Sequence, residues 1–491
     1  MKNYGDPVER DTIPVEYSSS PVRPRILFDI TTSMAWRGRR AVGIVRAERE
    51  LARCLMDAPD LCVIPVIYYD GAFRAIESEC AYKLISPAEP EKMAGAEAGA
   101  TDTRGMGHGH GTSQNPFAVV GKSATSSVRA LAHRAWSALP GRLRTRLRPA
   151  IVHLRRAFRG EVHEIGDTDG HAVLLDYDLD LSLVVYPASS DILFLCGLSW
   201  DVIDWTRIAV LREETGMRMV SMVYDLIPMK FPEFLCAPQG RYHNTFLGTI
   251  DNSDHIFCIS AQTEEDLRDF MKSSQRPPVP TEVIHLGANI AEKPNPAAIV
   301  DPKMRARLAK GRFALVVGTV EVRKNYGLLL DLWEEMMADP GFDLDLVIVG
   351  MPGWSADTVL QRLTVLTSFG TRVLWLKDLS DGGLAWLYRR CHVFLYPSLY
   401  EGWGLPVVEA LQQGRPIIAS NRGAIPEATF GMATVLDPED KAAWRVALLA
   451  EARAPRRCVT VPEEALSSWD KTAARIMERL KAILGQPSGT R

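Results

Sequence analysis

A strict alternation of short apolar runs with helix-length segments between residues 313 and 436 limits the fold of this chain more than any other feature. Apolar runs of strand length lie at residues 313–317, 344–349, 372–376, 393–396, 416–419 and 433–436. Amphipathic segments separate them, at residues 326–337, 356–367, 382–390 and 406–413, with a short helix expected at Pro426. Strands that alternate with helices indicate βαβ units and a parallel sheet.

A less regular form of the same pattern precedes residue 292. Strands are expected at residues 26–30, 62–69, 192–196, 217–224 and 255–259, and helices at residues 42–56, 201–215 and 262–271. A polar, proline-rich joint separates the two blocks. We therefore predict an α/β fold with two doubly wound, Rossmann-like domains, whose ligands bind beyond the carboxyl ends of the strands and face the interdomain cleft.

The length of 491 residues suits two or three domains. The predicted parts are a flexible arm (residues 1–24), an N-terminal domain (25–291), a linker (292–301), a C-terminal domain (302–465), and a final helix with a tail (466–491).

Composition excludes several classes of protein. The chain carries 57 Lys and Arg against 60 Asp and Glu, so it lacks the basic excess that nucleic-acid binding requires. Eight cysteines without a C-x-x-C pair predict neither a disulfide framework nor a zinc site. The first residues have no apolar core, and no uncharged apolar run approaches about 18 residues. We therefore expect a cytoplasmic protein without a signal peptide or a membrane-spanning helix.

Residues 88–171 interrupt the N-terminal domain as an irregular insertion. Residues 88–125 are rich in Gly, Ala, Ser and Thr, a composition that stays flexible. Residues 121–160 contain ten Lys or Arg and no Asp or Glu, interleaved with apolar residues such as Trp136 and Phe158. One interpretation is a basic amphipathic segment on an anionic membrane surface. The other is a solvated arginine-rich insertion packed on an acidic face of the protein itself.

Adjacent cations follow the first strand of the C-terminal block. The loop has the sequence GTVEVRKN, which begins at Gly318 and contains Arg323 and Lys324. The flat fork of donors on Arg and the compact charge on Lys both suit phosphate oxygens. The loop is therefore a candidate diphosphate site. The alternative is a surface loop with solvated charges.

Two carboxylates frame the loop that follows strand 393–396. They are Glu401 and Glu409, and between them lie Gly402, Trp403, Gly404, Leu405 and Pro406. Proline suits the first turn of a helix, and the free N–H groups of that turn form an anion site. We expect both carboxylates to point into one cleft and to accept hydrogen bonds from sugar hydroxyls. The alternative is that the two glutamates only favour the helix dipole.

The spacing from Glu401 to Glu409 resembles the E-x7-E motif of the retaining nucleotide-sugar glycosyltransferases of family 4, which have the GT-B fold. The surrounding sequence YPSLYEGWGLPVVEALQQGRPIIASNRGAIPE is similar to that family, as are LVIVGMPGW at residues 346–354 and GTVEVRKN. In the N-terminal half, GIVR at residues 43–46 and VYDLIPMKF at residues 223–231 resemble further family elements. The resemblance covers roughly residues 25–75 and 190–484.

This resemblance implies an acceptor-side N-terminal domain and a C-terminal domain that binds a nucleotide sugar. Lys324 with Arg323 would bind the donor diphosphate, and Glu409 would accept hydrogen bonds from the ribose. Glu401, with backbone amides of Gly402, Trp403, Gly404 and Leu405, would hold the donor sugar, and stacking on Trp403 is a further expectation. The loops that begin at Gly318 and Gly350 would border the donor, with the base near the end of strand 372–376.

The sequence departs from the family pattern at three places. Thr319 stands where the family often has Arg, and Tyr224 stands where a His commonly precedes the Asp. The first N-terminal loop, residues 34–40, has three arginines and one glycine in place of a glycine pair. A more cationic loop suits the diphosphate or a phosphorylated acceptor.

We therefore expect transfer of a hexose, with GDP-mannose as the first donor to test, to a lipid-linked glycan in surface polysaccharide biosynthesis. The resemblance implies retention without a metal or cofactor, with the protein at the inner face of the cell membrane. A GT-B scaffold without turnover is the alternative, which Thr319 and Tyr224 keep open. A sugar-nucleotide epimerase is a weaker alternative, because no acid and base flanking the sugar C2 can be named.

Overall fold

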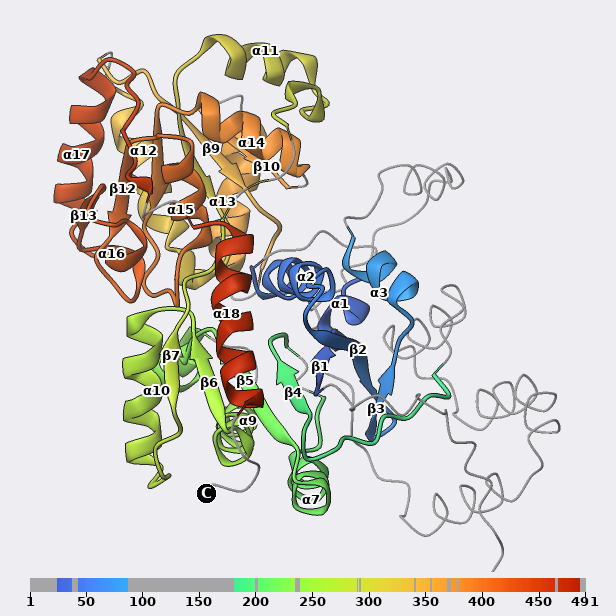
Figure 1. The fold of residues 1–491 in the computed structure, drawn as a ribbon. Helices are drawn as coiled ribbons and strands as arrows, with labels where there is room; N and C mark the ends of the chain where they lie inside the picture. Colours follow the sequence, from blue (N-terminus) through green and yellow to red (C-terminus); the bar gives the residue numbers. More distant parts are fainter. Residues whose placement is uncertain are drawn as a thin grey trace, which may run out of the picture.

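A computed structural model describes residues 24–37, 43–86, 181–198, 202–234, 239–288, 290, 293–339, 341–353, 356–368, 372–377, 379–463 and 467–485. Residues 1–23 of the expected arm, the insertion at 88–171 and its basic stretch at 121–160 lie outside this part of the chain. The described part contains two sheets, one in each half of the chain (Figure 1). The predicted α/β class with two Rossmann-like parallel sheets is confirmed.

The N-terminal sheet has seven strands in the order β3-β2-β1-β4-β5-β6-β7. The strands are β1 (Arg25–Asp29), β2 (Cys62–Tyr69), β3 (Ala72–Ala75), β4 (Ile192–Leu195), β5 (Arg218–Val223), β6 (His255–Cys258) and β7 (Thr281–Val283). All neighbours pair in parallel except β2 and β3, which are antiparallel. The strand order reverses between β1 and β4, so the loops after these two strands border a ligand crevice.

The helices of this half are α1 (Thr31–Ala35), α2 (Gly43–Met56), α3 (Ser78–Ile85), α7 (Trp205–Thr215), α8 (Ile227–Lys230), α9 (Gln239–Asn252) and α10 (Ala261–Ser273). Two of these helices, α7 and α10, have a polar N-cap residue. The side chain of Asp204 accepts hydrogen bonds from backbone N–H groups in the first turn of α7, and Ser260 does the same for α10. Such caps satisfy N–H groups that have no partner within the helix.

The C-terminal sheet has six parallel strands in the order β10-β9-β8-β11-β12-β13. They are β8 (Phe313–Val317), β9 (Asp345–Val349), β10 (Val373–Leu376), β11 (Val393–Tyr396), β12 (Ile417–Ser420) and β13 (Thr434–Leu436). Its helices are α11 (Pro302–Lys310), α12 (Tyr326–Met336), α13 (Asp357–Ser368), α14 (Asp381–Arg390), α15 (Leu405–Gln412), α16 (Ile425–Ala428) and α17 (Lys441–Arg453). The order reverses between β8 and β11, so the loops after these strands border the second crevice.

The last helix, α18 (Trp469–Leu484), returns to the N-terminal domain and lies along α2 and the β5–β6 side of the sheet (Figure 1). Its apolar face recurs at helical spacing and is buried, with members Trp469, Ala473, Ile476, Leu480 and Ile483. The hydroxyl of Thr472 donates to the carbonyl of His285 at 2.8 Å, and Arg479 pairs with Glu282 at 2.5 Å. This helix therefore ties the end of the chain to its first domain.

Every expected strand lies within one residue of an observed strand. The expected helix at residues 201–215 begins only at Trp205, because Asp204 caps it. The sequence did not predict β3, β7, α1, α3, α8, α9, α11 or α17. Strands β3 and β7 are only four and three residues long, too short for a clear periodic pattern.

Candidate active site

Two loops of the C-terminal domain meet where its strand order reverses. The loop after β8 contains a short 3-10 turn, Val322–Lys324, and the loop after β11 leads into α15. The N–H of Leu399 donates to the carbonyl of Arg323 at 2.8 Å and joins the two loops. The charges that the sequence places in separate loops therefore lie together.

Glu401 lies between the two predicted cations. Lys324 Nζ is 2.6 Å from Glu401 Oε1 and 2.9 Å from the hydroxyl of Tyr396. Arg323 forms an ion pair with Glu401 Oε2, and its guanidinium also lies 2.6 Å from Glu321 Oε1. The side chains of Arg323, Lys324 and Glu401 are 19%, 12% and 9% exposed, so solvent screens these pairs weakly.

The protonation state of Glu401 follows from these neighbours. Burial alone would raise the pKa of its carboxyl, but the positive charges of Arg323 and Lys324 outweigh burial and lower that pKa to about 2. Burial lowers the pKa of Lys324, and the nearby Arg323 adds to that effect against the attraction of Glu401. Glu401 is therefore ionised at neutral pH and compensates the cations beside it.

Glu409, the second carboxylate of the spacing, has different partners. The hydroxyl of Tyr388 on α14 donates to its Oε2 at 2.7 Å, and Arg46 of the N-terminal domain donates to its Oε1 at 2.8 Å. Burial raises the pKa of Glu409, although Arg46 and Tyr388 oppose the rise. Glu409 therefore lies where α15 meets the N-terminal helix α2.

Gly402 brings the loop after β11 into contact with the N-terminal domain. A Cβ atom at this position would lie 2.0 Å from the carbonyl oxygen of Tyr224 and 2.8 Å from Cβ of Asp225. The hydroxyl of Thr263 lies 3.1 Å from the Tyr224 carbonyl and 3.2 Å from the Gly402 carbonyl, and it can donate to either. Only glycine fits this approach, so the candidate site lies at the domain interface.

Trp403 is 2% exposed and stacks on His285, with ring centroids 4.4 Å apart and an interplanar angle of 15°. The structure does not support a sugar-stacking role for Trp403, because its side chain is buried and His285 stacks on one face of its ring. Gly404 is the N-cap residue of α15, and Leu405 is the first residue of that helix. Both lie, as expected, at the helix end nearest Glu401.

The loops after β8 and β9 touch at Gly318 and Gly350. A Cβ atom at Gly350 would lie 1.9 Å from the carbonyl oxygen of Gly318. Trp375 Nε1 donates to the Gly350 carbonyl at 2.9 Å, and the hydroxyl of Tyr326 donates to the Gly318 carbonyl at 2.6 Å. These bonds fix the backbone beside the position expected for the base, where Trp354 lies outside the described residues.

Glu48 of α2 contacts the loops after β1 and β4, which border the crevice of the N-terminal sheet. Its Oε1 accepts from the N–H and the hydroxyl of Ser33, both at 2.6 Å, in the loop after β1. Its Oε2 would lie 1.8 Å from a Cβ atom at Gly197, in the loop after β4. Burial and the nearby Asp29 raise the pKa of Glu48 to about 8. Glu48 has no sequence signal of its own, because it lies within an amphipathic helix.

Tyr224, which departs from the family pattern, and the neighbouring Asp225 both form hydrogen bonds within the N-terminal domain. The hydroxyl of Tyr224 donates to the carbonyl of Cys196 at 2.6 Å, so its hydrogen bond stays within the N-terminal domain. Asp225 accepts from the N–H of Ile227 at 3.0 Å, and burial raises its pKa against the effect of Arg323. Of the loop at residues 34–40, the part from 38 onward lies outside the described residues.

Two further polar contacts cross the domain interface. The hydroxyl of Tyr400 donates to Asp266 at 2.5 Å, and Lys230 binds the other oxygen of that carboxylate at 2.6 Å. Glu427 accepts from the N–H of Ala261 at 3.0 Å and lies 2.7 Å from His285 Nε2. These pairs have no sequence signal, because their members are far apart along the chain.

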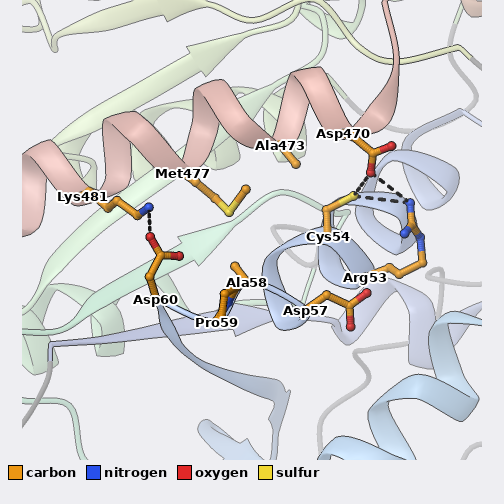
Figure 2. A pocket seen from close by; sticks show the side chains of 10 residues that line it. All are labelled: Arg53, Cys54, Asp57, Ala58, Pro59, Asp60, Asp470, Ala473, Met477 and Lys481. Carbon is orange, nitrogen blue, oxygen red and sulfur yellow. Dashed lines mark hydrogen bonds and ion pairs between the residues drawn. The ribbon is translucent and has the colours of Figure 1, made fainter.

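A cavity of about 260 Å³ lies away from the candidate site, between the end of α2 and helix α18 (Figure 2). Its lining includes Cys54, Asp470 and Met477 but none of the site residues. Within the described ranges, no group of three His, Cys, Asp or Glu side chains could hold a metal ion. None of the described helices has the length and hydropathy needed to cross a membrane.

Comparison with known proteins gives a family match for the C-terminal domain. Residues 301–453 match the family model described as Glycosyl transferases group 1. This match covers both loops that form the candidate site, from Gly318 to Lys324 and from Glu401 to Glu409.

Curated relatives are similar over part of the chain. The serotype-specific mannosyltransferase WbdA of Escherichia coli is 30% identical over 205 residues, which cover 40% of this chain and 25% of that protein. The O-antigen chain mannosyltransferase B of Escherichia coli is 30% identical over 228 residues, which cover 45% of this chain and 58% of that protein. The chain therefore spans less than two thirds of the length of either relative.

Solved structures are similar at lower identity. The structure of HepE from Anabaena in complex with UDP and glucose shares 17% identity with a TM-score of 0.47, over 59% of this chain and 78% of that one. The sucrose-phosphate synthase from Thermosynechococcus elongatus shares 21% identity with a TM-score of 0.43, over 64% and 76% of the two chains.

Proposed function

We propose that this protein is a glycosyltransferase that moves a hexose from a nucleoside diphosphate sugar onto a growing glycan. The observation that carries the proposal is the convergence of Lys324, Arg323 and Glu401 between β8 and β11, with Lys324 Nζ only 2.6 Å from Glu401 Oε1. Adjacent cations suit a diphosphate, and a carboxylate beside them suits a sugar hydroxyl. The match to group 1 glycosyl transferases covers the same loops.

The proposed chemistry is electrostatic. The bond between the sugar C1 and the diphosphate oxygen breaks while C1 bonds to the acceptor oxygen, and the acceptor proton passes to the departing diphosphate. Lys324 and Arg323 stabilise the charge that develops on that diphosphate, and the positive end of the α15 dipole adds to this effect. We propose that the acceptor attacks from the face the diphosphate leaves, so that the anomeric configuration is retained.

For the donor we propose GDP-mannose, and for the acceptor a lipid-linked glycan at the inner face of the cell membrane. The names of two relatives, both mannosyltransferases, support the sugar. The name of one refers to an O-antigen chain, which supports a growing surface polysaccharide as acceptor. The two domains meet at Gly402, directly beside Glu401, which supports a donor bound at the domain interface.

The test measures nucleotide release from GDP-mannose, UDP-glucose and ADP-glucose, with and without a lipid-linked acceptor. Release from GDP-mannose that rises with acceptor is expected, and NMR of the product should show the anomeric configuration of the donor. Release from none of the donors would favour the scaffold alternative. A thermal shift with UDP or ADP but not with GDP would refute the proposed donor, because a ligand that binds only the native state raises its stability.

A further inference from the structure

Arg46 connects the N-terminal domain to Glu409. It lies in the first turns of α2, and its Nη1 donates to Glu409 Oε1 at 2.8 Å. Its Nη2 lies 3.8 Å from Asp381 Oδ2 on α14. The side chains of Arg46 and Glu409 are 12% and 5% exposed, so water solvates both charges poorly and each charge depends on the other for compensation.

Three elements supply the charged and titratable groups around Glu409. Helix α2 supplies Arg46, and α14 supplies Tyr388 and Asp381, while Glu409 itself is on α15. Burial raises the pKa of Glu409, Arg46 and the hydrogen bond from Tyr388 lower it, and Asp381 raises it. Without Arg46, the carboxyl would therefore take up a proton at a higher pH than it does now.

We propose that Arg46 is a positioning residue for donor binding, which holds the Glu409 carboxylate in place to accept hydrogen bonds from the nucleotide ribose. The inference rests on the proposed function, because it assigns the ribose to Glu409. A carboxylate has about four lone-pair sites, two on each oxygen. Arg46 on Oε1 and Tyr388 on Oε2 therefore leave acceptor sites for hydroxyl groups. A protonated carboxyl would offer fewer of them.

Arg46 belongs to the N-terminal domain and Glu409 to the C-terminal domain, so the proposed ribose site depends on contact between the two domains. The pair exists only while α2 and α15 are in contact, so domain separation would remove the cation that compensates Glu409. Ribose binding therefore favours the closed arrangement, and the closed arrangement favours ribose binding. A cation supplied by a neighbouring strand of the same domain would not produce this coupling.

The test measures binding of GDP, UDP and ADP to the full chain by calorimetry, for the native protein and for Arg46→Gln and Arg46→Lys. Arg53→Gln is the matched control, since Arg53 is on the same helix and its exposed side chain pairs with Glu50. Affinity for the nucleotide that the native protein binds should fall about tenfold or more in Arg46→Gln. It should recover partly in Arg46→Lys and stay unchanged in Arg53→Gln.

The pH dependence separates this role from a structural one. Between about pH 8 and about pH 6, affinity should decrease at a higher pH in Arg46→Gln than in the native protein, because loss of Arg46 raises the pKa of Glu409 further. In a Glu409→Gln background, Arg46→Gln should have little further effect. If folded Arg46→Gln binds nucleotide as tightly as the native protein at both pH values, the inference is overturned. It is also overturned if Arg46→Gln lowers nucleotide affinity as much in the Glu409→Gln background as in the native protein. A native protein that binds none of the three nucleotides would overturn the proposed function and this inference together.

Discussion

Lys324 Nζ lies 2.6 Å from Glu401 Oε1, so the cation expected to bind phosphate is already paired within the protein. Tyr396 adds a hydroxyl at 2.9 Å, and its ring lies 4.9 Å from the ammonium group. A diphosphate that binds here competes with Glu401 for Lys324, while Arg323 keeps Glu401 compensated. Glu401 therefore holds the ammonium group of Lys324 in a fixed position, where the proposed diphosphate would meet it.

Replacing Lys324 by Gln should lower kcat/KM for transfer about tenfold or more, because a charge-assisted hydrogen bond to phosphate is worth roughly 1.5–3 kcal/mol. The fold should persist, since Arg323 still pairs with Glu401. Steady-state kinetics and the thermal unfolding midpoint check this together. Lys310→Gln, at an exposed position on α11, is the control. A loss of activity that unfolding explains completely would argue against the diphosphate role.

Replacing Glu401 by Gln should lower kcat more than it raises KM for the donor, because the carboxylate is proposed to hold the reacting sugar. The pKa of Glu401 is about 2, so it stays ionised across the working pH range of an enzyme. The acid side of the native pH–rate profile should therefore not be due to Glu401, and the variant should keep the same shape at lower amplitude. A variant profile whose acid limb has disappeared would contradict this assignment.

The local features of the site could be predicted from the sequence. The order of strands and helices places Lys324 and Glu401 directly after two strands, and parallel strands end at the same edge of a sheet. These predictions needed only neighbouring residues, which explains why they agree with the structure.

Contacts between the domains could not be predicted in this way. Arg46 and Glu409 are 363 residues apart, and the sequence of neither segment specifies the other. Tyr388 lies in an ordinary amphipathic helix, so nothing marks it as a partner of Glu409. Trp403 has the flanking residues of a ligand loop, yet His285 from the other domain stacks on one face of its ring. The contacts of Arg46 and His285 depend on how the two domains pack, and the contact of Tyr388 depends on how α14 packs against α15 within the C-terminal domain.

Gly402→Ala should destabilise the closed arrangement, because the new Cβ would lie 2.0 Å from the backbone carbonyl oxygen of Tyr224. Backbone atoms cannot move aside as a flexible side chain does, so the two domains must separate or shift. We expect lower transfer activity and faster proteolysis between the domains, measured by limited trypsin digestion. Gly240→Ala is the matched control, since nothing lies within 4 Å of its Cβ position. Equal digestion rates for both variants would show that Gly402 is not a tight contact.

Glu48→Gln should change how stability depends on pH. The pKa of Glu48 is raised from 4.5 to about 8 on folding, so between these values the native state binds more protons than the unfolded state. The contribution of Glu48 to the unfolding free energy therefore falls as the pH rises from about 4.5 to about 8. The variant should lose this component, which urea denaturation at a series of pH values will measure. Parallel curves for the native protein and the variant would refute the assignment.

The basic stretch at residues 121–160 should bind anionic membranes, which would bring the candidate site to a lipid-linked acceptor. Near an anionic surface each Lys or Arg contributes about 1 kcal/mol, and the effect falls off within a Debye length. Flotation with vesicles that contain anionic lipid should recover the full chain, and recovery should decrease as salt rises.

Replacing Arg142, Arg144 and Arg146 by Gln should weaken the recovery. Replacing Lys272, Lys303 and Lys310, which are exposed elsewhere, should not. Equal flotation of a chain that lacks residues 121–160 would refute membrane attachment through this stretch and favour its packing on the protein itself.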